Sequence, residues 1–363
     1  MDNSIFIAAL AGAIVTFVVS VFLVLSKQIH GKHTLDTKDG VQKFHTTPVP
    51  RIGGVAILAG YIASWAFMGG ETRTLWALIG LVGLPALVCG LAEDITKKVA
   101  VKWRLLATIG SGLLFTLVSG YSITTIDIPA LDTLLAIPLV TMVFTAFAIG
   151  GVANSINLID GFHGLASGTL IIILLAFALV GVRVGDVALV TIAVTMLLVV
   201  SGFFVVNFPH GKLFLGDAGA YFAGHVVAVL GVMLPARNPE VSPWVSLLIL
   251  SYPVTETLFS IVRRQRKDGH SPVSPDQEHL HHLVYRAWTL GFANNIHPSR
   301  TNNAITSVSI WTLPMMALLV IIFSNLHTEQ LLLFLTLGVT VYLIFYRLAL
   351  LAGRWLAKRG GLE

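Results

Sequence analysis

The chain has 363 residues, of which 55% are hydrophobic and 11% are charged, and its mean hydropathy is +0.84. Soluble domains carry about 25% charged residues, so this composition excludes a soluble globular protein and indicates an integral membrane protein. The formal net charge of +5 is no nucleic-acid signal, because no soluble domain of useful size remains between the apolar segments. The one cysteine, Cys89, excludes an intrachain disulfide and a multi-thiolate metal site.

A membrane-spanning helix needs about 20 apolar residues. Eleven segments approach that length, which predicts an all-α, polytopic membrane helix bundle with a single transmembrane domain over 1–363. The predicted spans are 4–25, 52–70, 75–92, 104–121, 133–153, 166–182, 187–206, 218–234, 243–262, 305–324 and 330–350. The first has an acidic residue and no Lys or Arg before it, which favours an uncleaved anchor over a signal peptide.

Lys and Arg predict the orientation, because they gather in cytoplasmic connections. With the N-terminus outside and the C-terminus cytoplasmic, 20 of the 23 Lys and Arg residues fall on the cytoplasmic side; the exceptions are Arg73, Arg183 and Arg237. We therefore predict this orientation. The predicted cytoplasmic loops are 26–51, 93–104, 154–165, 207–217 and 263–304.

The segment NSINLIDGFHGLASG, residues 154–168, lies between two predicted spans. Amides and a carboxylate at the end of a lipid-spanning helix are costly unless they have a function. Asn154, Asn157 and Asp160 are each three residues apart, which places them on neighbouring helical faces. Their oxygens suit Mg²⁺. For His163, a structural role is favoured over contact with a ligand.

Other polar residues lie on neighbouring predicted loops. Glu93 and Asp94 are adjacent carboxylates that either need a nearby cation or form a solvated helix end. Asp217 precedes a span, where it is either a helix cap or part of a site. Arg51, in PVPRIGG, either contacts a phosphate or is ordinary cytoplasmic charge.

The longest predicted loop carries SPDQEHLHHL, with His279, His281 and His282. These histidines suggest zinc, but the chain has no clear second His pair elsewhere, so substrate binding is favoured. Glu256 is an intramembrane acid for which a structural partner is favoured. His225 also lies within a span, and its sequence context assigns it no chemistry.

Asp94, Asp160, Asp217 and the histidines lie on four separate connections, all predicted at the cytoplasmic face. This coincidence predicts a catalytic site at that face. A transporter, the rival class, would hold polar groups near the middle of the bilayer. A membrane zinc enzyme is the third alternative.

Together these motifs resemble the polyprenyl-phosphate N-acetylhexosamine-1-phosphate transferase family (glycosyltransferase family 4, WecA- and MraY-like), and are closer to the WecA-like branch. PVPRIGG matches as it stands. GLAEDITKKV resembles the Asp-Asp motif with Glu93 for the first Asp, and NSINLIDGFHGLASG resembles NxxNxxDGxDGLxxG with His163 for the second Asp. FLGDAGAYFAG, SPDQEHLHHL and PVTETLFSIVRR resemble three further motifs, with Ala220 for Ser in the first and Glu256 for Asp in the last.

The resemblance implies transfer of a sugar 1-phosphate from a UDP-N-acetylhexosamine to undecaprenyl or another polyprenyl phosphate, with release of UMP, starting a lipid-linked cell-envelope glycan. It implies Mg²⁺ as cofactor, with Mn²⁺ as a substitute, and a bacterial inner-membrane protein whose active site is cytoplasmic. The nearest alternative substrate is a UDP-muramyl pentapeptide, and a homodimer is left open. No nucleic-acid partner is expected.

The same resemblance implies roles for particular residues. Asp217 and Asn157 are expected to hold the metal. Asp94, with Glu93, is expected to orient or deprotonate the lipid phosphate, and Asp160 is expected to matter for turnover. The remaining expected contacts, to nucleotide, phosphates or sugar, are Asn154, His163, Arg51, Lys102, His279, His281 and His282.

Overall fold

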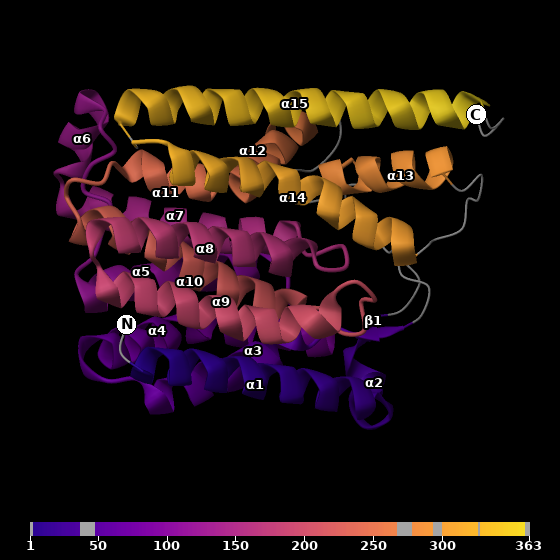
Figure 1. The fold of residues 1–363 in the computed structure, drawn as a ribbon, viewed down its shortest axis with the longest axis horizontal. Coiled ribbons are helices and arrows are strands. Elements are labelled where there is room, and N and C mark those ends of the chain that lie inside the picture. The colour runs from indigo at the N-terminus through magenta and orange to yellow at the C-terminus, as the bar shows by residue number, and fades with distance from the viewer. Residues whose placement is uncertain (1–2, 37–47, 267–277, 293–299, 326, 360–363) are drawn as a thin grey trace.

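The computed structural model describes residues 3–36, 48–266, 278–292, 300–325 and 327–359, and these are almost entirely helical (Figure 1). Nine helices in these ranges are long and apolar enough to cross a membrane. The prediction of an all-α, multi-pass membrane protein is therefore confirmed. The described residues also include two short strands, β1 (Leu35–Asp36) and β2 (Val49–Pro50), which pair antiparallel with Leu35 opposite Pro50.

In chain order the helices are α1 (Asn3–Leu25), α2 (Lys27–Thr34), α3 (Gly53–Phe67), α4 (Gly70–Thr96), α5 (Val101–Ser119), α6 (Pro129–Leu135), α7 (Pro138–Leu158), α8 (Leu165–Val184), α9 (Val187–Asn207), α10 (Gly216–Arg237), α11 (Pro243–Ile249), α12 (Ser251–Gln265), α13 (Leu280–Phe292), α14 (Arg300–Phe323) and α15 (Thr328–Arg359).

Every predicted span coincides with helical structure, although two of them cross a break. The segment 133–153 begins in α6 and continues in α7. The segment 243–262 is two helices, α11 and α12, which meet at a bend of 77°. The break lies at Leu250, three residues before Pro253, which has no N–H to continue a helix and whose ring clashes with the preceding turn. Another predicted span, α3, has only 15 residues. The count of eleven crossings stays a prediction.

The loops near the polar motifs are shorter than predicted, because the helices continue past their apolar stretches. Helix α4 ends at Thr96, so Glu93 and Asp94 lie on its last turn. Helix α7 ends at Leu158, so Asn154 and Asn157 are helical as well. Hydropathy marks the part of a helix that lies in lipid and not the polar turns beyond it, so the non-helical connections 97–100, 159–164 and 208–215 lie within the predicted loops 93–104, 154–165 and 207–217.

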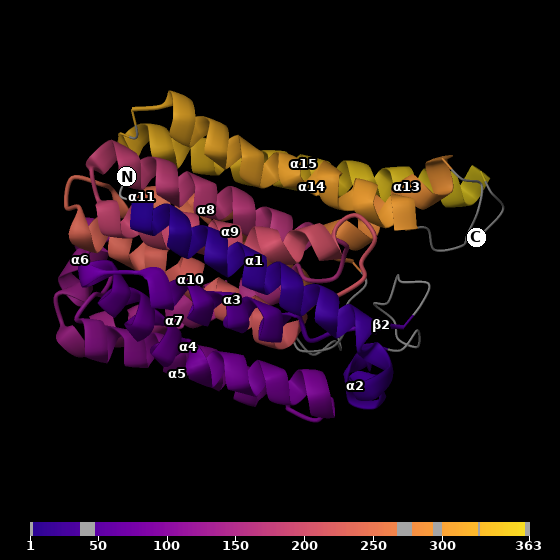
Figure 2. The same cartoon turned by 60° about the horizontal axis from the view of Figure 1, so that its bottom comes forward.

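Helix α10 lies at the centre of the bundle and is buried along nearly its whole length (Figures 1 and 2). It packs against α3, α4, α7 and α8. Its first nine residues, GDAGAYFAG, are mostly small. Small side chains let membrane helices approach closely, and this makes α10 the element around which the others are placed.

The two termini lie at opposite ends of the helices in Figure 1. At the end of the bundle near the N-terminus, Arg237 links the last turn of α10 to two neighbouring segments. Its guanidinium donates to Asp186, before α9, at 2.7 and 3.2 Å, and to Glu71, at the start of α4, at 2.7 Å. Termini at opposite ends are what an odd number of crossings requires.

Candidate active site

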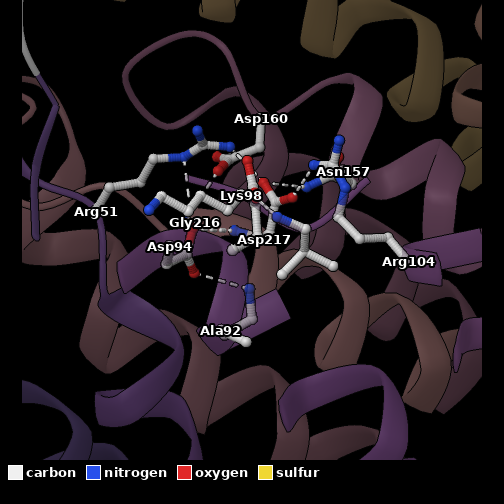
Figure 3. A network of polar contacts seen from close by, with 12 residues as sticks. Arg51, Ala92, Asp94, Lys98, Arg104, Asn157, Asp160, Gly216 and Asp217 are labelled. Carbon is white, nitrogen blue, oxygen red and sulfur yellow. Dashed lines mark hydrogen bonds and ion pairs between the residues drawn. The ribbon is translucent and has the colours of Figure 1, made fainter. Parts of the chain in front are cut away.

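The N-terminus of α10 meets the carboxylates of two other segments (Figure 3). Asp94, fully buried on α4, accepts the backbone N–H groups of Asp217 and Ala218, each at 2.9 Å. Asp160, in the turn after α7, accepts the N–H of Gly216 at 3.1 Å. The first N–H groups of a helix have no partner within the helix, so these two carboxylates supply what α10 lacks. By holding the first turn of α10, they also fix the direction in which the Asp217 side chain points.

The carboxylate of Asp217 is the meeting point of the site. One oxygen accepts from the guanidinium of Arg51 and, at 3.1 Å, from the amide of Asn157. The other oxygen accepts from the guanidinium of Arg104. Asp217 is 1% exposed, and its two arginine partners are partly exposed. Three segments that are far apart in the sequence therefore converge on the buried carboxylate of a fourth.

Arg51 is placed by backbone pairing between the start of α3 and the segment before α10. Phe214 donates its N–H to Pro50 at 2.9 Å, and Gly53 donates back to Phe214 at 2.9 Å. Arg51 also approaches Asp94, with 3.7 Å between Nε and Oδ1. The turn PVPRIGG thus brings one cation to two of the carboxylates.

Two glycines permit this close approach. Gly216 has a φ of +74°, and a Cβ there would lie 2.6 Å from Asp94 Oδ2. Gly90, one turn before Asp94, faces the start of α10, and its Cβ would lie 2.6 Å from the backbone N of Ala218. Only residues without a side chain let α4 come close enough for Asp94 to cap α10.

The surroundings of Asp160 change its acidity. Burial raises the pKa of Asp160 to about 7, although the nearby charge of Arg51 and the bond from Gly216 oppose the rise. A cation that approached this side chain would favour its ionised form. Asp160 thus exchanges a proton near neutral pH.

The three histidines of HLHHL are buried beside the same turn. The ring of Phe162 contacts those of His281 and His282, with centroids 5.2 and 5.9 Å apart. His281 Nε2 lies 3.5 Å from where a Cβ on Gly161 would stand. Burial, with the charges of neighbouring histidines, holds the pKa of His281 well below its usual range, so this imidazole is neutral at neutral pH.

Other predicted contacts point elsewhere in this structure. The backbone N–H of His163 donates to Asn303 at 2.6 Å, and its Nδ1 lies 3.0 Å from the carbonyl of Pro209. Asn154 donates to Thr108 at 2.7 Å, on α5. Lys102 is exposed, with Nζ 5.4 Å from the ring centroid of Trp103. Their roles toward a substrate stay predictions.

The family model of glycosyl transferase family 4 matches residues 76–235, which include Asp94, Asp160 and Asp217. The chain is 27% identical over 334 residues to a probable undecaprenyl-phosphate N-acetylglucosaminyl 1-phosphate transferase of Bacillus subtilis, covering 87% of this chain and 91% of the relative. It is 24% identical to the undecaprenyl-phosphate alpha-N-acetylglucosaminyl 1-phosphate transferase of Escherichia coli strain K12, over 74% of each chain. It is 27% identical to the decaprenyl-phosphate N-acetylglucosaminephosphotransferase of Mycolicibacterium smegmatis, over 66% of each.

The central part of the chain is similar to glycosyl transferase family 4, and most of its length is similar to these relatives. The resemblance seen in the motifs is confirmed. The matched region holds the carboxylates of the cluster, whereas Arg51 and the histidines of HLHHL lie outside it.

Arg104 is the site residue that the sequence did not single out. It lies ten residues after Asp94 and belongs to the basic group that served to predict the orientation. Counting basic residues does not tell which of them faces inward. Two positions from exposed Lys102, Arg104 lies on another face of α5 and reaches Asp217. Glu93, the neighbour of Asp94, accepts the N–H of Val99 at 2.8 Å and shapes the turn between α4 and α5.

The oxygen donors around Asp217 fit a hard divalent cation. Mg²⁺ prefers carboxylate and amide oxygens and usually keeps water or substrate phosphates among its ligands. Asp217 already attracts two guanidinium cations, and Asn157 adjoins it. Among the described residues no group of three His, Cys, Asp or Glu side chains is arranged to hold a metal ion by itself.

Proposed function

We propose that this protein transfers N-acetylglucosamine 1-phosphate from UDP-N-acetylglucosamine to a polyprenyl phosphate and releases UMP. The observation that carries the proposal is Asp217, a buried carboxylate at the end of the central membrane helix, on which Arg51, Arg104 and Asn157 converge. The activities named for the relatives support the same reaction. A lipid substrate and a water-soluble one can meet at such an end of the bundle.

The proposed reaction is one phosphoryl transfer. An oxygen of the lipid phosphate attacks the β-phosphorus of the nucleotide sugar, and the bond from that phosphorus to the α,β-bridging oxygen breaks. The electron pair leaves with UMP, and the lipid carries the sugar diphosphate. Such transfers are catalysed chiefly by positioning and by stabilising charge. Arg51 and Arg104 supply positive charge for the diphosphate oxygens when they turn from Asp217 toward the substrate.

The carboxylates hold this arrangement in place. Asp217 and Asn157 would hold Mg²⁺, which when bound neutralises charge on the diphosphate. Asp94 keeps α10 in position, because both of its oxygens accept backbone N–H groups. Asp160 lies at the edge of the cluster and would face the bound substrate. A role of Glu93 and Asp94 toward the lipid phosphate is kept as a prediction.

We place the reaction at the cytoplasmic face of the bacterial inner membrane, because nucleotide sugars are made in the cytoplasm. The charge distribution supports this side, since 20 of 23 Lys and Arg residues fall on it in the predicted orientation. The product would start a lipid-linked glycan of the cell envelope.

The test uses purified protein in detergent with undecaprenyl phosphate, Mg²⁺ and a panel of UDP-sugars. UMP and a lipid-linked sugar should form with UDP-N-acetylglucosamine. No UMP from any UDP-N-acetylhexosamine would overturn the proposed function. UMP from UDP-muramyl pentapeptide alone would replace the substrate, and movement of a labelled lipid across liposomes without UMP would indicate a transporter.

A further inference from the structure

A second buried polar network lies beside the site and includes the C-terminal helix. Its centre is Glu256 on α12, which is fully buried. Glu256 Oε1 lies 3.0 Å from His279 Nδ1 and accepts the backbone N–H of Leu280 at 3.4 Å. Glu256 Oε2 accepts the hydroxyl of Tyr342, on α15, at 2.9 Å. Neither Glu256 nor Tyr342 lies within the region that the family model matches.

The chemistry of these groups fixes the proton on the imidazole. An ionised carboxylate only accepts hydrogen bonds, and a backbone N–H and a tyrosine hydroxyl already donate to this one. The third partner, His279 Nδ1, then carries a hydrogen that it donates to Glu256, and the hydroxyl of Ser260, 3.0 Å from the same nitrogen, is a second acceptor for that N–H. Its other nitrogen, Nε2, is left as the one that meets a ligand. A buried carboxylate without such donors would be costly, so the network holds together only as a set.

The network also places His279 relative to the site. The rings of His279 and His281 stack, with centroids 5.4 Å apart, and His281 borders Gly161, next to Asp160. A second contact from α15 holds the same segment from behind: Tyr346, four residues after Tyr342, lies 2.9 Å from Arg263, which donates to the carbonyl of Glu278. Helix α15 thus fixes the start of α13, where the histidines lie.

We propose that Glu256 and Tyr342 are positioning residues that lock His279 in the Nδ1–H tautomer and so direct its Nε2 toward the phosphates or sugar of the substrate. The part about the substrate rests on the proposed function; the tautomer does not. Carboxylates commonly orient functional histidines in this way, above all those that bind metals. Loss of such a carboxylate typically lowers activity about 10- to 100-fold.

The first measurement is the ring ¹⁵N spectrum of histidine-labelled protein in detergent, with His279 identified by its absence from the spectrum of His279→Gln. The neutral ring of His279 in wild type should carry its hydrogen on Nδ1 and none on Nε2. Glu256→Met should release this preference. A wild-type His279 with its proton on Nε2, or a Glu256→Met spectrum like wild type, would overturn the proposal.

Glu256→Met alone leaves the Tyr342 hydroxyl buried without its acceptor. The double variant Glu256→Met/Tyr342→Phe removes both polar groups while keeping their volumes, which is better tolerated than removing one. Tyr346→Phe is the matched control on the same face of α15, because its hydroxyl contacts Arg263 and not Glu256. It should leave the His279 tautomer unchanged; a shift as large as that in Glu256→Met would reduce the network to general packing.

The second measurement is UMP release. Glu256→Met should lower kcat about 10- to 100-fold, and Tyr342→Phe should lower it less, since the carboxylate remains. If wild type forms no UMP from any UDP-sugar, the proposed function fails and the tautomer result still stands on its spectrum. If wild type is active, the tautomer is as expected and both variants keep full kcat, the positioning role is refuted.

Discussion

Asp217 is a buried carboxylate whose charge is favoured by Arg51 and Arg104, one on each of its two oxygens, against the cost of burial. Asparagine has nearly the same shape but no charge to attract Mg²⁺ or guanidinium groups. Asp217→Asn should therefore lower kcat at least about 100-fold, as expected for losing a charge that organises phosphoryl transfer. UMP release measures the effect, and gel filtration shows whether the variant is folded. Exposed Glu240→Gln, at the opposite end, is the control; equal losses in both would remove Asp217 from the mechanism.

Arg104 and Lys102 lie two residues apart on α5 and allow a direct comparison. Arg104 reaches Asp217, whereas Lys102 lies over the ring of Trp103 at the surface. Losing a guanidinium from the cluster should lower kcat/KM about 10- to 100-fold in Arg104→Gln, on the scale of a charged hydrogen bond. Lys102→Gln should lower it less. A larger loss in Lys102→Gln than in Arg104→Gln would mean that Lys102, and not Arg104, contacts the bound substrate.

The raised pKa of Asp160 predicts a pH-dependent stability. Its carboxyl has a pKa of about 7 in the folded protein and about 3.9 in an unfolded chain. Between these values the folded state holds the proton more tightly, so Asp160 makes the free energy of unfolding fall as pH rises from about 4 to about 7. Asparagine does not titrate. The stability of Asp160→Asn relative to wild type should therefore increase with pH across this window.

Thermal unfolding of both proteins in EDTA, at several pH values between about 4.5 and about 7.5, measures this difference. EDTA keeps divalent cations from shifting the proton. Parallel curves for the two proteins would show that Asp160 titrates below the window, as an exposed carboxyl does.

At the level of elements, the contact between α4 and α10 decides whether the site forms. Gly90 faces the backbone of α10, and a Cβ there would lie 2.6 Å from both Ala218 N and Asp217 C. Overpacking of this kind typically costs about 1–3 kcal/mol. Gly90→Ala should lower the melting temperature and activity together, because it moves Asp94 away from α10. In α7, a Cβ on Gly151 would meet no atom within 4 Å, so Gly151→Ala should leave both nearly unchanged or slightly raise stability. If Gly90→Ala changed neither the melting temperature nor the activity, the close contact between α4 and α10 would not be needed for the site.

The sequence predicted the elements better than their ends. Hydropathy located helical structure in every predicted span, because about 20 apolar residues in a row have few alternatives in lipid. It missed the break at Leu250, which depends on the single residue Pro253, and a window average dilutes one residue. It also placed Asn154 and Asn157 in a loop, since the polar last turns of α7 lie beyond the apolar stretch.

The candidate site was predictable in its carboxylates and less so in its cations. Asp94, Asp160 and Asp217 were expected together because the charge distribution put their connections on one side. The structure brings them together at the start of α10. Arg104 was missed because basic residues near a membrane are common and the sequence does not show which face of α5 each occupies. The partners of Glu256 depend on long-range packing between α12, α13 and α15, which no local pattern encodes.

For the whole molecule, the predicted orientation in the membrane is what assigns the site to the cytoplasmic face. Glu240 and Lys212 are both exposed and lie in connections at opposite ends of α10. In a Cys89→Ala background, a cysteine at either position is the only thiol of the chain. In intact spheroplasts, a membrane-impermeant maleimide should label Glu240→Cys and spare Lys212→Cys. Both should react after permeabilisation, which controls for accessibility. Labelling in the opposite order would turn the bundle over, put the carboxylate cluster outside the cell, and separate it from cytosolic nucleotide sugars.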